Sequence, residues 1–415
     1  MDSDVIVIGA GPAGLCLARA LALRGLDTTV VERQPLAAIA EPAFDGREIA
    51  LTHASMRILR ELGVWQRLAA DEIAPLRRAR VIDGDDAGFE VDAAAFGRDR
   101  LGVLVSNQSI RRAAWAAIDG EARVRVCAAA TVAAVGGEAT HAWLRLADGT
   151  PLRAPLLVAA DSRFSETRRA MGIAADLHDF GRSMLVCRIA HADPHHGVAW
   201  EWFGRGQTRA LLPLREHLAS AVLTVPGDEA QRLAALPPDA FARELEARYE
   251  GRLGAIELAS TVHAYPLVST WAHAFVAGRC ALAGDAAVGM HPVTAHGFNL
   301  GLAGVARLAD AIAAGVAQHG DAGHPLPLAR YERAHRRESR VLYAGTRAVV
   351  ELFGADRTPL RPLRRAVLGT MRALPPLRRA LAAGLIDEAR QPASVLRHAR
   401  IALDVLRPRF GNPGA

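Results

Sequence analysis

Lysine is absent from the chain, so all fifty of its basic residues are arginine. A chain without lysine can form no lysine Schiff base and has no P-loop lysine for a triphosphate. Cysteine is scarce as well, since only four cysteines occur, far apart and without a CxxC pair. This spacing indicates neither a zinc site nor a disulfide framework, and we expect buried thiols in a reducing compartment.

Long apolar runs are missing too. No uninterrupted run reaches the roughly 18 residues that cross a bilayer, and no basic segment with a following apolar stretch precedes Val5. The sequence therefore predicts neither a membrane-spanning helix nor secretion, and it favours a cytoplasmic location. With 415 residues, of which 51% are hydrophobic, the chain is long enough for about two to three domains.

The N-terminal segment has the pattern of a nucleotide-binding strand, turn and helix. Four β-branched residues, Val5 to Ile8, predict a strand buried on both faces, and the glycines of GAGPAG follow at once with GxGxxG spacing. In this pattern the first glycine permits the tight turn, the second leaves room for a pyrophosphate, and the third lets the helix Pro12 to Arg24 approach the sheet. The cofactor-binding residues expected here are Gly9, Gly11, Pro12, Ala13 and Gly14.

A second strand, Thr28 to Val31, ends in Glu32, about 20 residues after the glycines. An acidic residue at this place accepts hydrogen bonds from a ribose diol. We include Glu32 and its neighbour Arg33 among the expected cofactor-binding residues. This motif by itself does not separate FAD from NAD.

Two further apolar runs also end in acidic turns. Leu156 to Ala160 is followed by Asp161, and Ala281 to Ala283 is followed by Gly284 and Asp285. We call the turns that follow Ile8, Ala160 and Ala283 the first, second and third corners. After the second turn come His291 and Pro292, then a helix expected to start near Gly297 and to continue through Ile312. The positive end of such a helix would face an anion.

The order GAGPAG, AADSRFSETRR, GDAAVGMHP resembles the FAD-dependent aromatic hydroxylases of the para-hydroxybenzoate hydroxylase type, and within them the ubiquinone-biosynthesis hydroxylases. The resemblance covers about residues 4 to 386. The blocks FDGREIALTHASMRILRELGVW and HPVTAHGFNLGL look most like the subgroup called UbiM. The family resemblance implies an α/β fold, with a Rossmann-like FAD-binding domain around a parallel sheet, an inserted antiparallel-sheet substrate domain and a C-terminal helical arm.

The resemblance also implies roles for single residues. Asp161 would lie near the pyrophosphate and Asp285 near the ribitol, while Arg47 would lie beside the flavin and its pyridine-nucleotide donor. The remaining cofactor-binding positions implied by the resemblance are Asn107 and Arg111 in VSNQSIRRAAW, Pro292 beside the isoalloxazine, and Gly297, Phe298 and Asn299 near the flavin pyrimidine. No residue is singled out as certainly catalytic; the flavin-adjacent candidates are His291, Pro292 and His296.

The chain departs from the commoner family pattern at two corners. Many relatives read AGQGLN where this chain has His296 in place of an amide and Ala295 in place of a glycine, and Ser162 follows Asp161 in place of a glycine. His296 either donates a hydrogen bond or charge to reduced flavin, or it caps or packs the loop. Both interpretations stay open.

The segment between the second and third corners predicts an antiparallel sheet. Its runs are Met184 to Ala190, Val198 to Phe203, Thr208 to Leu214 and Leu218 to Val225. Alternation places Trp200 and Trp202 on one face, where they line an aromatic pocket or belong to the core. The substrate-pocket candidates are Trp200, Trp202, Leu212 and Pro266, the last of these in a Tyr-Pro-Leu sequence that resembles a turn of the family.

We expect three regions. The FAD-binding domain comprises residues 1–75, 100–180 and 275–345, the substrate domain comprises 76–99 and 181–274, and a basic helical arm comprises 346–415. From Arg357 to Ala415, twelve arginines stand against three acidic residues, a net charge of +9, whereas the whole chain carries +6. Leucines recur there every three or four residues, so the arm either lies on an anionic membrane or packs on the protein. Nucleic acid is not an expected partner.

The expected activity follows from the resemblance. Reduced flavin reacts with O2 to give a C4a-hydroperoxide, which hydroxylates the aromatic ring of a polyprenyl-phenol precursor of ubiquinone, with NAD(P)H as electron donor. We expect FAD, and no metal. The enzyme would act in the cytoplasm or peripherally on the inner face of the membrane, with a ubiquinone-biosynthesis complex as a possible partner. The alternatives are a hydroxylase of soluble phenols and a flavin-bearing lipid-binding or assembly subunit without turnover.

Overall fold

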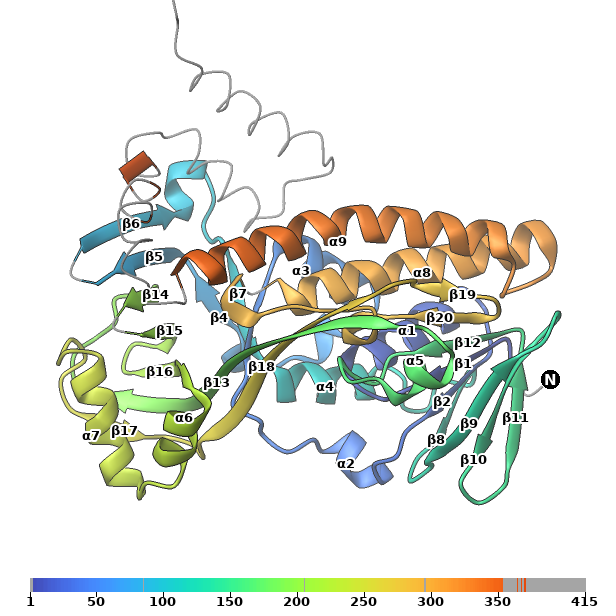
Figure 1. Cartoon of the computed structure of the whole chain (residues 1–415), viewed down its shortest axis with the longest axis horizontal. Helices are drawn as coiled ribbons and strands as arrows, with labels where there is room; N and C mark the ends of the chain where they lie inside the picture. Colours follow the sequence, from blue (N-terminus) through green and yellow to red (C-terminus); the bar gives the residue numbers. More distant parts are fainter. Residues whose placement is uncertain are drawn as a thin grey trace, which may run out of the picture.

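The computed structural model describes residues 3–84, 86–204, 206–294, 296–353, 364, 367, 369 and 370. Figure 1 shows β-structure at both ends of the molecule, with two long strands, β13 (Ala175–His191) and β18 (His263–Ala272), running between the ends. The long helices α8 (Gly297–His319) and α9 (Pro325–Phe353) lie side by side along one edge. The α/β class with parallel and antiparallel sheets, predicted from the sequence, is confirmed.

A six-stranded sheet carries the N-terminal motif. Its order is β19-β20-β12-β1-β2-β8, and every neighbouring pair is parallel except β19 with β20. The strands are β1 (Val5–Ile8), β2 (Thr28–Val31), β8 (Val124–Cys127), β12 (Leu156–Ala159), β19 (Val276–Ala277) and β20 (Cys280–Leu282). The strands predicted after Asp4, after Asp27 and before Asp161 and Gly284 are thus confirmed.

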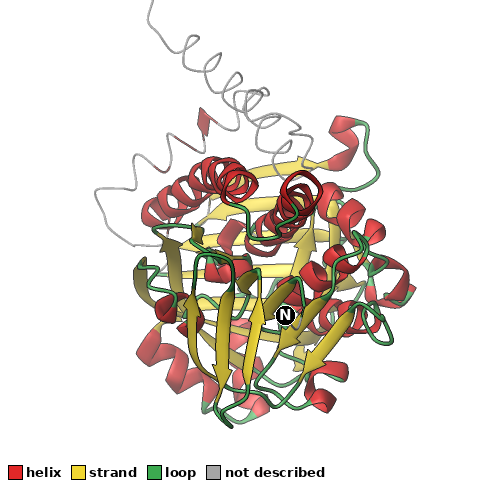
Figure 2. Ribbon diagram, turned by 90° about the vertical axis from the view of Figure 1, so that its right-hand side faces the viewer, coloured by secondary structure: helices red, strands yellow, loops and turns green. Residues whose placement is uncertain are grey.

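Both faces of this sheet are covered, which explains its unbroken apolar strands. Val5 and Val7 pack toward the helices, whereas Ile6 and Ile8 pack toward a three-stranded sheet. That sheet consists of β9 (Val132–Gly137), β10 (Ala142–Leu146) and β11 (Pro151–Ala154). Figure 2 views the molecule from the end that carries it.

The helical layer joins segments that are far apart in sequence. Its helices are α1 (Pro12–Ala22), α2 (Leu36–Ala40), α3 (His53–Glu61), α4 (Asn107–Ala116) and α5 (Glu166–Ala170), together with α8 and α9. The helix predicted to run to Arg24 ends at Ala22, and the one predicted through Ile312 continues to His319. A small sheet of β3 (Glu48–Leu51), β7 (Gly102–Ser106) and β4 (Ala74–Leu76) lies between this layer and the larger sheet.

The larger sheet has nine strands. Its main path is β21-β18-β13-β16-β15-β14-β5-β6, and β17 pairs with β13. Besides β13 and β18 it comprises β5 (Arg78–Asp83), β6 (Asp86–Asp92), β14 (Val198–Gly204), β15 (Gln207–Arg215), β16 (Leu218–Pro226), β17 (Ile256–Leu258) and β21 (Val288–Gly289). The four predicted runs form antiparallel neighbours here, as expected, while β14 also pairs in parallel with β5.

Two helices cover one face of the nine-stranded sheet, and we call this the outer face. They are α6 (Gly227–Ala234) and α7 (Pro238–Arg248), which pack on alternate residues of β13, β15 and β16 such as Leu185, Leu211 and Leu223. The opposite, inner face is turned toward the first sheet and its helices. The boundary predicted at residues 180 and 181 falls inside β13, so the division into two domains remains our proposal.

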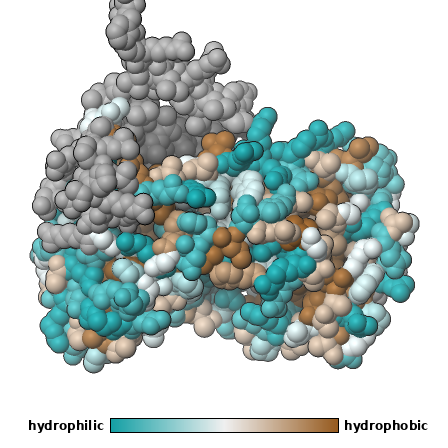
Figure 3. All heavy atoms as spheres, in the orientation of Figure 1, coloured by the Kyte–Doolittle hydropathy of each residue, from teal (hydrophilic) through white to brown (hydrophobic). Residues whose placement is uncertain are grey.

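Short 3-10 helices complete the described chain: η1 (Trp65–Arg67), η2 (Ala70–Glu72), η3 (Ala93–Phe96), η4 (Gly284–Ala286) and η5 (Pro292–Thr294). Within the described residues, α8 is the single helix long and apolar enough to cross a membrane, although half of its most apolar window is buried. It packs against α1, α9 and η4, as a core helix does. On the face shown in Figure 3, apolar residues occur in small groups among hydrophilic ones.

Most of the predicted C-terminal arm lies outside the described residues. Four of its positions after α9 are described, and two of these pack on the protein. Arg364 is 3% exposed and its Nε donates to the carbonyl of Leu352 at 2.5 Å. Val367 packs against the apolar cluster that contains Phe353.

Candidate functional site

The glycine corner after β1 and the two acidic corners after β12 and β20 meet at one edge of the parallel sheet. A Cβ on Gly9, which has a φ of +107°, would lie 2.7 Å from the carbonyl oxygen of Ala160 and 2.8 Å from the Cα of Asp161. A Cβ on Gly284 would lie 2.9 Å from the Cβ of Ala13. The corners follow β1, β12 and β20, whose carboxyl ends lie at this edge, the usual ligand edge of an open parallel sheet.

The glycines of the first corner meet different surroundings. A Cβ on Gly14 would overlap the carbonyl oxygen of Gly9, because α1 lies close on its own turn. A Cβ on Gly11 would have no atom within 4 Å. Gly11 precedes Pro12, the first residue of α1, so its open side lies at a helix N-terminus. This is the arrangement that accommodates a pyrophosphate.

Glu32 is fixed at the end of β2 by backbone donors. Its Oε2 accepts from the N–H of Ala10 at 2.8 Å and its Oε1 accepts from the N–H of Gln34 at 2.9 Å. Each carboxylate oxygen has a second acceptor site for a ribose hydroxyl. Nearby, Arg111 donates to the Gln34 side chain at 3.5 Å, and burial lowers the pKa of Arg111. Arg33 is exposed.

Two arginines that were not among the predicted site residues join the second and third corners. Arg163 donates to Oδ2 of Asp285 at 3.0 Å and to the carbonyl of Val268 at 3.0 Å. Buried Arg168 donates to the carbonyl of Ala286 at 3.0 Å. Asp161 accepts weakly from the N–H of Thr167 at 3.4 Å through Oδ2, while its buried Oδ1 has no hydrogen-bond partner in the described part of the chain. An unpaired buried carboxylate oxygen at this edge fits a bound polar ligand.

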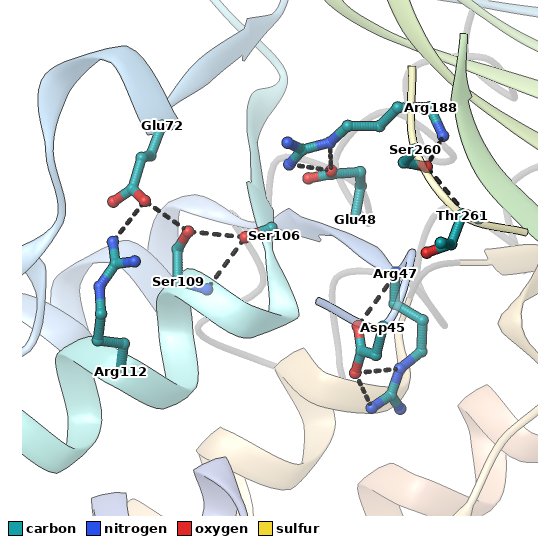
Figure 4. A network of polar contacts seen from close by, with 10 residues as sticks. All are labelled: Asp45, Arg47, Glu48, Glu72, Ser106, Ser109, Arg112, Arg188, Ser260 and Thr261. Carbon is teal, nitrogen blue, oxygen red and sulfur yellow. Dashed lines mark hydrogen bonds and ion pairs between the residues drawn. The ribbon is translucent and has the colours of Figure 1, made fainter. Parts of the chain in front are cut away.

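Arg47 belongs to a compact polar cluster with Asp45, Asn107 and Tyr265. Figure 4 shows its guanidinium folded onto Asp45, with distances of 2.6 and 3.1 Å to Oδ2. Asn107 donates to the same oxygen at 2.7 Å, and the Tyr265 hydroxyl donates to the Asp45 carbonyl at 2.7 Å. Burial opposes ionisation of Asp45, yet the charge and hydrogen bonds of Arg47, with the hydrogen bond of Asn107, lower its pKa.

A second ion pair in Figure 4 joins the small sheet to the larger one. Arg188 on β13 donates to Oε1 of Glu48 on β3 at 2.6 and 2.9 Å, and its guanidinium lies 4.7 Å from the ring centre of Phe44. The Glu48 side chain is 1% exposed. Burial raises the pKa of Glu48, although Arg188 opposes this shift.

The turn after the third corner holds a neutral histidine. His291 is buried, its Nδ1 accepts from the N–H of Val293 at 3.2 Å, and its ring packs edge-on against Phe180 at 4.8 Å. Burial, followed by the charges of Arg163 and Arg182, lowers the pKa of His291 to about 4. The imidazole is therefore uncharged at neutral pH. Pro292 is exposed at the start of η5.

The start of α8 is tied to the small sheet by Asn299. The side chain of Asn299 accepts from the N–H of Thr52 at 3.0 Å and donates to the carbonyl of Ala50 at 2.8 Å. Phe298 packs against the main core, and Gly297 leaves its surroundings open. His296 directly precedes the helix with backbone angles in the helical region. The first turn of α8 is thus held in place from β3.

The four substrate-pocket candidates lie in different surroundings, and the two tryptophans are on the outer face. Trp202 is fully buried beneath the outer face, where its indole lies 3.6 Å from the Arg209 guanidinium and donates to the carbonyl of Gly84. Trp200 packs with the cluster under α6 and α7. Of the two interpretations of these tryptophans, pocket or core, this packing favours the core, because the layer of α6 and α7 lies over that face.

Leu212 and Pro266 also differ from one another. Leu212 alternates with the buried Leu211 and is partly exposed on the inner face. Pro266 is exposed and lies within β18, not in a turn as the family resemblance suggested. Its neighbour Tyr265, which was not among the candidates, is the residue that contacts Arg47, at 5.4 Å from ring centre to guanidinium.

The sequence of this chain matches those of known proteins. The family described as "FAD binding domain" matches residues 2–343. The chain is 43% identical over 384 residues to the ubiquinone hydroxylase UbiM of Neisseria meningitidis, covering 91% of this chain and 83% of that protein. It is 34% identical over 377 residues to the ubiquinone hydroxylase UbiL of Rhodospirillum rubrum, covering 91% and 88%.

A solved structure supports the fold. The p-nitrophenol 4-monooxygenase PnpA of Pseudomonas putida superimposes with a TM-score of 0.73 at 19% identity, covering 98% of this chain and 99% of that one.

Proposed function

The chain belongs to the FAD binding domain family, and from this premise we propose that it hydroxylates the aromatic ring of a polyprenyl-phenol intermediate of ubiquinone biosynthesis. It is an FAD-dependent aromatic-ring monooxygenase that uses NAD(P)H as electron donor. The observation that carries the choice of substrate is the 43% identity, over nearly the whole chain, to a relative named as a ubiquinone hydroxylase.

The residues at the sheet edge fit FAD. We propose that Gly11 and the N-terminus of α1 receive the pyrophosphate, with Pro12 and Ala13 alongside. Glu32 then accepts hydrogen bonds from the adenosine ribose, and the buried Oδ1 of Asp161 accepts from a donor near the pyrophosphate. The close contacts at Gly9, Gly14 and Gly284 shape this edge. Arg33 and Arg111 remain candidates at its rim.

At the other end of the cofactor, Asp285 is proposed to bind the ribitol chain while Arg163 holds its carboxylate. Gly297, Phe298 and Asn299 are proposed to place the positive end of α8 against the pyrimidine edge, where it stabilises negative charge. His291 and Pro292 would border the ring, and His291 would do so uncharged. His296 remains a candidate for a hydrogen bond there.

Bound FAD supplies the redox chemistry, since it takes electrons from NAD(P)H and delivers one oxygen atom of O2 to the ring. The chain's task is to bind, orient and exclude water. We propose that the donor docks near Arg47, whose side chain is 40% exposed although Asp45 holds its guanidinium. Asn107 acts through the same carboxylate, so it would position Arg47.

The aromatic ring of the substrate is proposed to lie between the cofactor and the inner face of the nine-stranded sheet, where Leu212 is accessible. We place the enzyme in the cytoplasm, and propose contact with the inner membrane surface through the basic arm, because a polyprenyl chain resides in the bilayer. Association with other ubiquinone-biosynthesis proteins belongs to the same proposal.

Deletion of the gene tests the function. A strain with no redundant hydroxylase is expected to lose ubiquinone and to accumulate a precursor that lacks one ring hydroxyl, both measured by mass spectrometry of lipid extracts. Re-expression of the chain should restore the quinone, whereas a Gly11→Asp variant, which puts a carboxylate where the pyrophosphate is expected, should not. A normal quinone profile in the deletion strain would contradict the proposed substrate.

A further inference from the structure

Glu201 lies in the middle of β14 on the inner face of the nine-stranded sheet. Its neighbours along the chain, Trp200 and Trp202, are on the outer face, so alternation turns Glu201 the other way. Phe203, two residues on and on the same face as Glu201, belongs to an apolar cluster against which Val293 of η5 packs. The carboxyl of Glu201 therefore lies on the same face of the sheet as an apolar cluster that contacts η5.

The strand register makes this wall apolar around Glu201. Its cross-strand partners are Ala210 on β15 and Val81 on β5, and beyond Ala210 come Val222 on β16 and Val186 on β13. Glu201, Ala210 and Val222 all keep some accessible surface, whereas the outer-face residues Leu211 and Leu223 are buried. A single half-buried carboxyl thus stands among apolar side chains on this face.

No described side chain or backbone group forms a hydrogen bond or ion pair with this carboxyl. Arg182, on β13, donates to the carbonyl of Gly206 at 2.7 Å, and Arg209 is on the outer face and donates to the carbonyl of Arg248. Tyr249, packed from α7 on the far side of the sheet, donates to the carbonyl of Ala210 at 2.7 Å.

Burial raises the pKa of Glu201 to about 8. A desolvated carboxyl without a partner weakens the fold. Such a group is typical of a functional site, where activity is favoured over stability.

We propose that Glu201 is a catalytic residue that binds the phenolic hydroxyl of the substrate and accepts its proton. The O–H bond breaks, its electron pair stays on the phenol oxygen, and the proton moves to a Glu201 carboxylate oxygen. The resulting phenolate ring is more electron-rich and therefore a better nucleophile toward the oxygen that the cofactor delivers. This inference rests on the proposed function, since it requires a phenol as substrate.

Binding to the FAD-loaded, oxidised enzyme gives the first test. The probes are 2-prenylphenol and its methyl ether, titrated while the flavin absorbance is followed. The native chain should bind the phenol about tenfold or more tightly than the ether, because only the phenol donates to Glu201. Glu201→Leu should lose this preference. The control Glu90→Gln, which removes a carboxylate of β6 that is paired with Arg80 of β5, should keep this preference. Retained preference in Glu201→Leu would overturn the proposal.

Kinetics separate proton transfer from binding. In Glu201→Gln the amide still accepts a hydrogen bond but takes no proton, so hydroxylation should slow by about 100-fold. NAD(P)H oxidation should continue and release hydrogen peroxide in place of product. In the native chain the hydroxylation rate should rise with pH as Glu201 ionises near pH 8, since the base form exists above its pKa. Glu201→Gln should lack this rise, and an unchanged pH profile would count against the proposal.

Thermal unfolding excludes a merely structural role. Because the carboxyl has no partner among the described residues, both Glu201 variants should melt at or above the temperature of the native chain, and a clear drop would contradict the inference. If the native chain hydroxylates no prenylphenol, the proposed function fails, even where binding still depends on Glu201. If it hydroxylates and the Glu201 variants match it, only this inference fails.

Discussion

Single residues at the sheet edge divide into those that shape the backbone and those that leave room for a ligand. Gly9 and Gly14 are glycine because neighbouring backbone occupies the position of a side chain. Gly11 has no such neighbour, so the protein itself does not require glycine there. A requirement for glycine at residue 11 can then come only from what binds beside it.

A matched pair of alanine variants tests this division. Gly14→Ala should lower the free energy of unfolding by about 1–3 kcal/mol, because its methyl group overlaps the Gly9 carbonyl. Gly11→Ala should stay within about 0.5 kcal/mol of the native value, yet bind FAD about tenfold or more weakly. Urea unfolding and quenching of flavin fluorescence measure the two quantities. Unchanged FAD affinity in Gly11→Ala would place the pyrophosphate elsewhere.

At the scale of elements, α8 depends on β3 for the position of its first turn. Asn299 satisfies the N–H of Thr52 and the carbonyl of Ala50, two backbone groups at the end of β3. The helix N-terminus is useful for an anionic ring only if it is held at a fixed place. The Asn299 side chain supplies this restraint, although the sequence resemblance placed Asn299 near the flavin.

Asn299→Ala should therefore impair both stability and cofactor retention. Removing the side chain leaves two backbone groups without their partner, which costs about 2–4 kcal/mol at 1–3 kcal/mol each, with some recovered by water. The purified variant should carry less FAD per chain, measured from the ratio of flavin to protein absorbance. Gln66→Ala serves as control, because the Gln66 amide makes one exposed bond to the Arg60 carbonyl. Full FAD content in Asn299→Ala would show that α8 is positioned without it.

For the whole molecule, contacts between its two sheet systems frame the site. The Glu48–Arg188 pair and the Tyr265 bond to Asp45 both connect the FAD-binding part to the inner face of the larger sheet. The positive charge of the molecule is concentrated elsewhere, in the arm after α9. Arg364 and Val367 of this arm pack on the protein, so an informative truncation has to begin beyond them.

A chain that ends at Thr370 tests the membrane proposal. It keeps the contacts of Arg364 and Val367 but lacks eight of the twelve arginines of the arm. We expect unchanged FAD content and melting temperature, and at least about tenfold weaker sedimentation with vesicles that contain phosphatidylglycerol, at about 1 kcal/mol per arginine near the surface. Neither chain should bind pure phosphatidylcholine vesicles. Added salt should weaken the binding of the full chain to the phosphatidylglycerol vesicles. Equal binding by both chains would assign membrane contact to another surface.

The sequence by itself determined the three corners, the parallel strands before them and the antiparallel runs between them. It could do so because each corner is local: an apolar run, then glycine or an acid, at the end where parallel strands meet. Glu32, Asp161 and Asp285 were found in this way. The family resemblance then added the cofactor and the chemistry to the pattern.

Only the tertiary structure decided which side of the larger sheet is available. Trp200 and Trp202 share one face by alternation, but α6 and α7 pack over that face, and this packing depends on contacts distant in sequence. The same long-range packing leaves Glu201 and Leu212 partly accessible on the opposite, inner face and brings Arg163 to Asp285. Periodicity determines which residues share a face, whereas the partner layers decide which face is core.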